Sequence, residues 1–147
     1  MNKPQQLNVA HIVNISKILW FGMLASSPMF LIAIFYMDKL QLLEPVFPDL
    51  KNILTGICVL SIALSLIPLG RFKRHQHKIR DNIQLDIDNT PSDLQSYITY
   101  IVIGMSLCNL PAMLGLVLYI LVTDLYLSLF FIVVSFFLGF LYKPELK

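Results

Sequence analysis

Four long apolar segments alternate with shorter polar stretches along this 147-residue chain. The apolar segments cover residues 18–37, 53–70, 97–122 and 125–142. A hydrocarbon core of about 30 Å needs about 20 apolar residues of α-helix, so each segment is long enough, or nearly so, to cross a bilayer. The pattern predicts an all-α fold, an integral membrane four-helix bundle that forms a single transmembrane domain over residues 1–147.

Local signals at the ends of the segments support these bounds. Pro48 followed by Asp49 is typical of a helix start, because the first turn does not need the N–H that proline lacks. Residues 90–93, Thr-Pro-Ser-Asp, have the form of a capping box at the start of the third helix. Thr123 and Asp124 form a tight turn, and either can cap the fourth helix.

The polar stretch after the second segment is predicted to be a loop over residues 71–92. Pro68 either kinks the second helix or marks the point where it leaves the hydrocarbon. Within the stretch Ile79, Ile83 and Ile87 recur every four residues, so a helical piece with an apolar side is also consistent with the pattern.

Composition and charge agree with a membrane protein and give it an orientation. Hydrophobic residues make up 56% of the chain and charged residues only 14%, against about 25% charged in soluble domains. Nine Lys and Arg lie in the two terminal flanks and the 71–92 stretch, which four crossings place on one side of the membrane. Two, Lys39 and Lys51, lie in the connections on the other side. The positive-inside rule therefore predicts an inner-membrane, multi-pass protein, N-in and C-in, with a cytoplasmic loop. The net charge of +2 is too small to indicate a nucleic-acid partner.

The first and third segments can be aligned on their prolines, Pro28 and Pro111. Both contain a Gly-Met pair before the proline, at residues 22–23 and 104–105, with one extra residue before the second proline. Both also place a tyrosine eight residues after the proline, at Tyr36 and Tyr119. We interpret this as an internal repeat in which two hairpins follow one another in tandem, although apolar helices can also look alike by chance.

A small set of residues inside the segments is suited either to helix packing or to a polar path. Asn109 is an amide in the apolar middle of a segment and must find hydrogen-bond partners, most simply on another helix. The prolines free backbone carbonyls near Leu24 and Leu107, which a nearby serine or another helix can satisfy. The candidate residues are Asn109, Pro111, Pro28, Ser26, Ser27, Gly104 and Cys108.

The interiors of the four segments contain no Asp, Glu, Lys, Arg or His. Proton relays, cation-coupled carriers and voltage sensors need an ionisable group there. We also find no catalytic nucleophile–base arrangement and no metal-binding spacing, so we expect no enzyme activity, no metal and no cofactor. The basic residues of the polar stretch either bind lipid headgroups or serve only as a topological anchor. They are Arg71, Lys73, Arg74, Lys78 and Arg80.

Residues 105–119, MSLCNLPAMLGLVLY, resemble the outer helix of rotary-ATPase proteolipid (c-type) subunits. They are still more similar to uncharacterised small four-helix bacterial membrane proteins whose third helix carries an ALxExPALLG pattern, which residues 110–115 follow. The resemblance implies the doubled-hairpin plan. Asn109 stands where that pattern has its glutamate, and an amide cannot carry a proton.

The sequence thus favours a non-catalytic integral membrane subunit or scaffold of a larger membrane assembly. Its partners would be the lipid bilayer and other membrane proteins, or further copies of itself as a homo-oligomer. The alternative is a small transport or proteolipid-like component that uses Asn109 as part of a polar path.

Overall fold

The computed structural model describes residues 3–41, 43–84 and 91–145, with side chains for residues 11–82 and 92–145 apart from residue 42. Every regular element in this part of the chain is helical. The elements are α1 (Lys3–Leu24), α2 (Ser26–Lys39), the 3₁₀ turn η1 (Pro48–Leu50), α3 (Lys51–Gln84), α4 (Pro91–Val122) and α5 (Leu125–Leu141).

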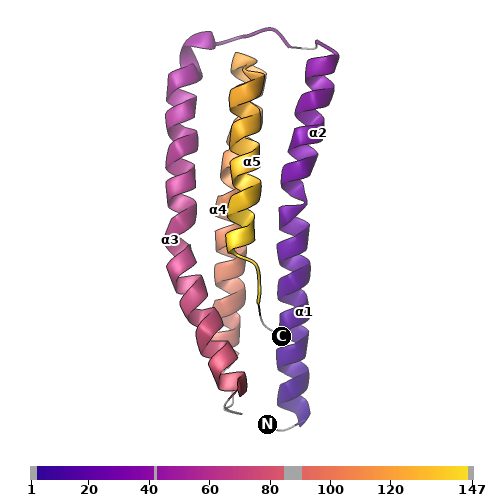
Figure 1. Cartoon of the computed structure of the whole chain (residues 1–147), viewed down its shortest axis with the longest axis vertical. Coiled ribbons are helices and arrows are strands. Elements are labelled where there is room, and N and C mark those ends of the chain that lie inside the picture. Colours follow the sequence, from indigo (N-terminus) through magenta and orange to yellow (C-terminus); the bar gives the residue numbers. More distant parts are fainter. Residues whose placement is uncertain (1–2, 42, 85–90, 146–147) are drawn as a thin grey trace.

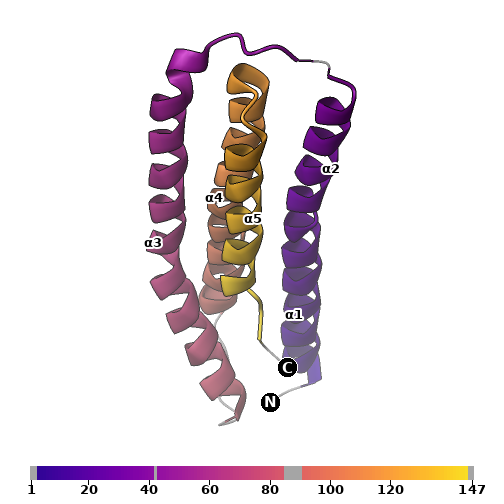
Figure 2. The same cartoon turned by 45° about the horizontal axis from the view of Figure 1, so that its top comes forward.

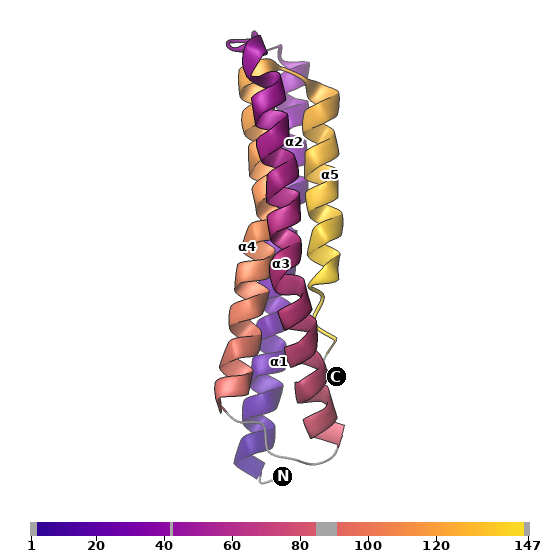
Figure 3. The ribbon, with the colours of Figure 1, turned by 90° about the vertical axis from the view of Figure 1, so that its left-hand side faces the viewer.

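These helices form four rods, because α1 and α2 continue one another across a break at Ala25 (Figure 1). The rods over His11–Lys39, Pro48–Asn82 and Ser92–Val122 are long and apolar enough to cross a membrane. The fourth, α5, is apolar but has only 17 residues. It ends well before the lower ends of α1, α3 and α4 (Figure 3). All four predicted crossings are therefore helices.

The order of the rods differs from two tandem hairpins. Helices α4 and α5 pack against each other, α3 packs mainly on α4, and α1 and α2 pack on α4 and α5. Within the described residues no Cα atom of α3 lies within 8 Å of one in α1 or α2, and these rods lie on opposite sides of the α4–α5 pair (Figure 1). The tandem-hairpin prediction is therefore wrong for the first half of the chain, and only α4–α5 is a packed hairpin.

Residues 43–47, which lead into η1, pass over the ends of α4 and α5 (Figure 2). The backbone N–H groups of Val46 and Phe47 both donate to the carbonyl of Leu121, at 3.1 and 3.0 Å. This carbonyl is in the last turn of α4, where it has no partner within the helix. The link holds the connection across the bundle instead of letting α3 fold back on α2.

Of the two interpretations of residues 71–92, a loop or a helical piece with an apolar side, the structure shows the helical piece for residues 71–84. Helix α3 continues through Pro68 to Gln84, and α4 begins at Pro91, with residues 85–90 outside the described part. Phe72, Gln76 and Ile79 explain the continuation, because they share one face of α3 and are all buried. Phe72 stacks on Tyr97 of α4 with ring centroids 5.7 Å apart. This packing offsets the hydrogen bond lost at Pro68, and α3 bends partway along its length (Figure 1).

Candidate functional site

The break between α1 and α2 lies one turn before Pro28. Proline has no N–H to give to the carbonyl four residues earlier, and its ring crowds that carbonyl. The helix therefore interrupts at Ala25, whose N–H still donates to Phe21 at 3.0 Å. Side chains contact the carbonyl of Met23, which directly precedes Leu24, the residue whose carbonyl Pro28 leaves without an N–H.

Asn109, near the middle of α4, lies against this break. Its Nδ2 donates to the Met23 carbonyl at 3.2 Å. Its Oδ1 lies 3.1 Å from the Ser26 hydroxyl and 3.5 Å from the Ser27 hydroxyl. Ser26 also lies 2.7 Å from the Met23 carbonyl, and its single proton can serve either acceptor. The amide thus uses both its donor and its acceptor on the neighbouring rod.

The contacts continue to α5 through Ser135. The Ser27 and Ser135 hydroxyls are 3.5 Å apart, and Ser135 donates to the Cys108 carbonyl at 2.5 Å. One chain of polar groups therefore crosses α1/α2, α4 and α5. We call it the polar seam: Met23 and Cys108 through their carbonyls, with the side chains of Ser26, Ser27, Asn109 and Ser135.

The other predicted packing residues lie along α4. Pro111 is fully buried and, unlike Pro28, does not interrupt its helix. Cys108 is a buried free thiol that enters the polar seam only through its carbonyl. Gly104 faces the ring of Tyr142, and a Cβ there would lie 2.1 Å from the Tyr142 Cε1. The close approach at Gly104 is therefore to an aromatic ring from the segment after α5.

Sequence reasoning missed Ser135 and Tyr142. The available signal was periodicity, because Ser128, Ser135, Gly139 and Tyr142 follow each other at 7, 4 and 3 residues and all are buried. Such spacings place residues on one face of a helix. A polar and small stripe on a helix that is otherwise apolar all round marks its packed face.

The five basic residues of the predicted headgroup site lie on the lower half of α3. Lys78 pairs with Asp93 at 2.8 Å, and Arg80 contacts His77 at 2.8 Å. Lys73 lies over the Phe72 ring, 5.7 Å from its centroid. Arg71 borders a cavity of about 290 Å³ that Pro68, Tyr100 and other apolar residues also line. Arg74 is exposed.

Three polar contacts lie at the opposite end of the bundle. Tyr119 donates to Asp38 at 3.0 Å. Asp124 accepts from the N–H of Leu127 at 3.0 Å, and so caps α5, and it pairs with Lys51 at 2.6 Å. The Lys51 hydrogen bond, helped by the backbone N–H of Leu127, lowers the pKa of Asp124 below its ordinary value.

No protein family model, no curated protein and no solved structure matches this chain. Within the described residues no group of three or more His, Cys, Asp or Glu side chains is placed to hold a metal ion. The features of the molecule that bear on function are therefore the helices, the polar seam and the charged residues at the two ends of the bundle.

Proposed function

We propose that the chain is an inner-membrane protein that crosses the bilayer four times, with both termini in the cytoplasm. Three rods long and apolar enough to cross a membrane support this. The 17 residues of α5 extend about 26 Å at 1.5 Å per residue, close to the thickness of the hydrocarbon. The excess of Lys and Arg around the termini and the lower half of α3 supports the orientation.

Within this membrane its role is that of a non-catalytic subunit or scaffold of a larger assembly. The polar seam favours this role over a transport path. The side-chain NH₂ of Asn109 donates to the Met23 carbonyl, and its side-chain oxygen accepts from the Ser26 and Ser27 hydroxyls. An amide engaged in this way fastens one rod to another, since intramembrane hydrogen bonds of this kind join helices.

The outward surface leaves room for partners. Large apolar side chains are exposed along α2 and α3, as a lipid-facing or partner-facing surface requires. They include Met29, Ile32 and Phe35 on α2, and Ile53, Leu60 and Ile67 on α3. Lipid, another membrane protein or a second copy of the chain would each fit this surface.

Transport through a polar path at Asn109 is the alternative, in line with the resemblance to proteolipids. It would require the hydrogen bonds of the polar seam to open so that a solute or ion could replace them. The satisfied contacts of Asn109 favour the packing role over this path.

Extraction in a gentle detergent followed by mass spectrometry tests the assembly. One or a few copies that co-purify with other membrane proteins would support the subunit role. A ring of many identical copies would contradict it and favour the proteolipid-like alternative.

Replacement of Asn109 by leucine tests the polar seam itself. We expect Asn109→Leu to insert normally and to lower the stability of the bundle by about 1 kcal/mol or less, the usual size of such hydrogen bonds. Denaturation in detergent, followed by helical circular dichroism, measures the change. Met113→Leu is the control, because Met113 is exposed on the same helix. Loss of function in cells with assembly and stability unchanged would instead support a polar path.

A further inference from the structure

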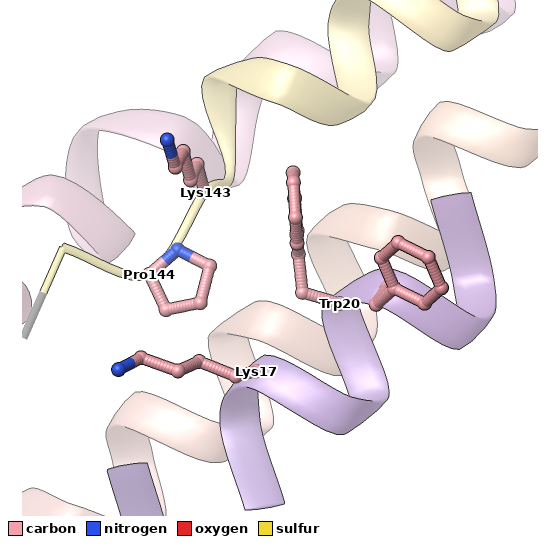
Figure 4. A pocket seen from close by; sticks show the side chains of 5 residues that line it. Lys17, Trp20, Lys143 and Pro144 are labelled. Carbon is pink, nitrogen blue, oxygen red and sulfur yellow. The ribbon is translucent and has the colours of Figure 1, made fainter. Parts of the chain in front are cut away.

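A cavity of about 280 Å³ opens on the side of the bundle where α5 ends. Its lining combines two ammonium groups with apolar surface: Lys17, Trp20 and Phe21 come from α1, and Lys143 and Pro144 follow α5. Figure 4 shows the Pro144 ring between the two lysines, with the Trp20 ring on the other side of the opening. Neither the sequence pattern nor the polar seam accounts for this combination.

The walls of the cavity are fixed by hydrogen bonds and packing. The Trp20 indole N–H donates to the Gly139 carbonyl at 2.9 Å. Its ring packs edge-on against Phe140, with the centroids 5.8 Å apart. The backbone of Lys143 donates to Phe140 at 3.1 Å and accepts from Gln76 at 3.4 Å. Both the aromatic wall and the base of the Lys143 side chain are therefore held in place.

No carboxylate of the described residues forms an ion pair with the two lysines of the cavity. Lys17 and Lys143 are both exposed. Lys51 and Lys78, in contrast, each pair with an aspartate within 3 Å. Two cations without a counter-charge beside one opening attract an anion.

The position of the cavity along the rods matches the boundary between headgroups and hydrocarbon. Lys17 directly precedes the first predicted crossing, and Lys143 directly follows the fourth. Beyond Lys17, the α1 side chains Ile18 and Phe21 are 72% and 68% exposed. The surface therefore changes from charged to apolar within one helical turn. A phospholipid changes from charged headgroup to apolar acyl chains over a similarly short distance.

We propose that this cavity binds one anionic phospholipid, with its phosphate at Lys17 and Lys143 and one acyl chain along Phe21 and the Trp20 ring. The cavity volume is just below the range of about 300–1,000 Å³ for pockets that enclose a whole ligand. It therefore takes the headgroup, and the acyl chains remain in the bilayer. Both lysine stems are flexible enough for their ammonium groups to reach the same phosphate. The proposal rests on the membrane insertion proposed above.

The only tryptophan of the chain lines this cavity, so its fluorescence reports on the site. The protein is reconstituted into phosphatidylcholine vesicles that contain a minor fraction of phosphatidylglycerol. Bromine on the acyl chains quenches indole fluorescence on contact, and the label is placed either on the phosphatidylglycerol or on an equal fraction of the phosphatidylcholine. We expect stronger quenching by the brominated phosphatidylglycerol.

Substitutions distinguish the effect of these two lysines on lipid preference from the effect of the net charge of the protein. Lys17→Gln and Lys143→Gln should each lower the preference for phosphatidylglycerol by about fivefold, the contribution of one basic residue near an anionic surface. The double variant Lys17→Arg/Lys143→Arg keeps the charge and should keep the preference. Lys39→Gln is the matched control, since Lys39 is an exposed lysine at the other end of the same rod.

The outcomes distinguish this proposal from the one on which it rests. Equal quenching by both brominated lipids would show membrane insertion without a headgroup site and would overturn the lipid site alone. No quenching by either lipid would overturn membrane insertion and the lipid site together. Loss of the preference in the presence of inorganic phosphate would show a site for free anions, and would also overturn the lipid site.

Discussion

Among the six glycines of the chain, Gly104 has the least space for a side chain. A Cβ at this position would lie 2.1 Å from Cε1 and 2.5 Å from Cδ1 of Tyr142. The Tyr142 ring has little freedom to move away, because its hydroxyl donates to the Ser65 carbonyl and its ring packs on Phe72 with centroids 5.3 Å apart. Gly104 therefore lets the segment after α5 insert between α3 and α4.

We expect Gly104→Ala to destabilise the bundle by about 1–3 kcal/mol, the usual cost of overpacking. The overlap with Tyr142 outweighs the gain of up to about 1 kcal/mol in helix propensity. Gly22→Ala is the matched control, because nothing lies within 4 Å of a Cβ there. The detergent denaturation midpoint measures both variants. A Gly104→Ala protein as stable as Gly22→Ala would contradict this account of the packing.

Single residues also show how far the sequence predicts the polar seam. An amide in an apolar helix must be satisfied, so the need of Asn109 for partners follows from its type alone. Ser26 and Ser27 were candidates because Pro28 disturbs the backbone beside them, and these are the hydroxyls that face Asn109. Ser135 was not a candidate, because its role depends on how α5 is rotated against α4, which no local signal states.

At the scale of elements, helix starts were more predictable than helix continuations. Helix α4 begins at Pro91, although Thr90 of the predicted capping box lies outside the described residues. Pro48 begins η1, which leads into α3, and Asp124 caps α5. These starts depend on one or two neighbouring residues. The continuation of α3 beyond Pro68 depends on burial of Phe72 against α4, which is tertiary packing that the local pattern does not contain.

The start of α5 also gives a dependence of stability on pH. The pKa of Asp124 is lowered from 3.8 by Lys51 and by the N–H of Leu127, so the folded state favours the charged carboxylate. Its stabilisation is therefore present above the unfolded pKa and is lost as the pH falls through the lower, folded pKa. We expect Asp124→Asn to flatten the decline in thermal stability below about pH 4.

Two further variants distinguish the contribution of the Lys51–Asp124 ion pair from that of the Asp124 helix cap. Lys51→Met should flatten the same pH range, because the lysine is the largest cause of the shift. At neutral pH Asp124→Ala should cost about 1 kcal/mol, and Asp124→Asn less, since asparagine also caps helices well. Melting curves between pH 3 and 7 measure all three variants. An unchanged pH profile in Asp124→Asn would show that the contact with Lys51 does not stabilise the fold.

At the scale of the whole molecule, the number of rods follows from the sequence but their arrangement does not. Length and hydropathy predict each rod separately. Which rods touch depends on a few small and polar residues, such as Ser135 and Gly139, among many interchangeable apolar ones. The hydrogen bonds from Val46 and Phe47, in the connection before η1, to the Leu121 carbonyl add a further constraint on the arrangement. This is why α3 packs on α4 rather than beside α2.

Orientation in the membrane is the prediction that depends on the whole chain, and single cysteines at exposed positions test it. His77 and Glu145 lie at the end of the bundle expected in the cytoplasm, and Gln41 and Glu44 at the other end, and all four are exposed. Gln76, although adjacent to His77, is only 4% exposed, so a cysteine there would report burial instead of sidedness. The native Cys58 and Cys108 are buried and give little background.

In intact bacterial cells, a membrane-impermeant maleimide should label Gln41→Cys and Glu44→Cys but not His77→Cys or Glu145→Cys. Permeabilisation should make the second pair reactive, which shows that their thiols are accessible once the reagent crosses the membrane. The physical reason is the excess of Lys and Arg at the His77 end, because such residues are retained on the cytoplasmic side. Labelling of His77→Cys before permeabilisation would reverse the orientation. It would also place the proposed phospholipid site in the outer leaflet of this membrane, because Lys143, which lines the cavity with Lys17, accepts a hydrogen bond from Gln76, next to His77.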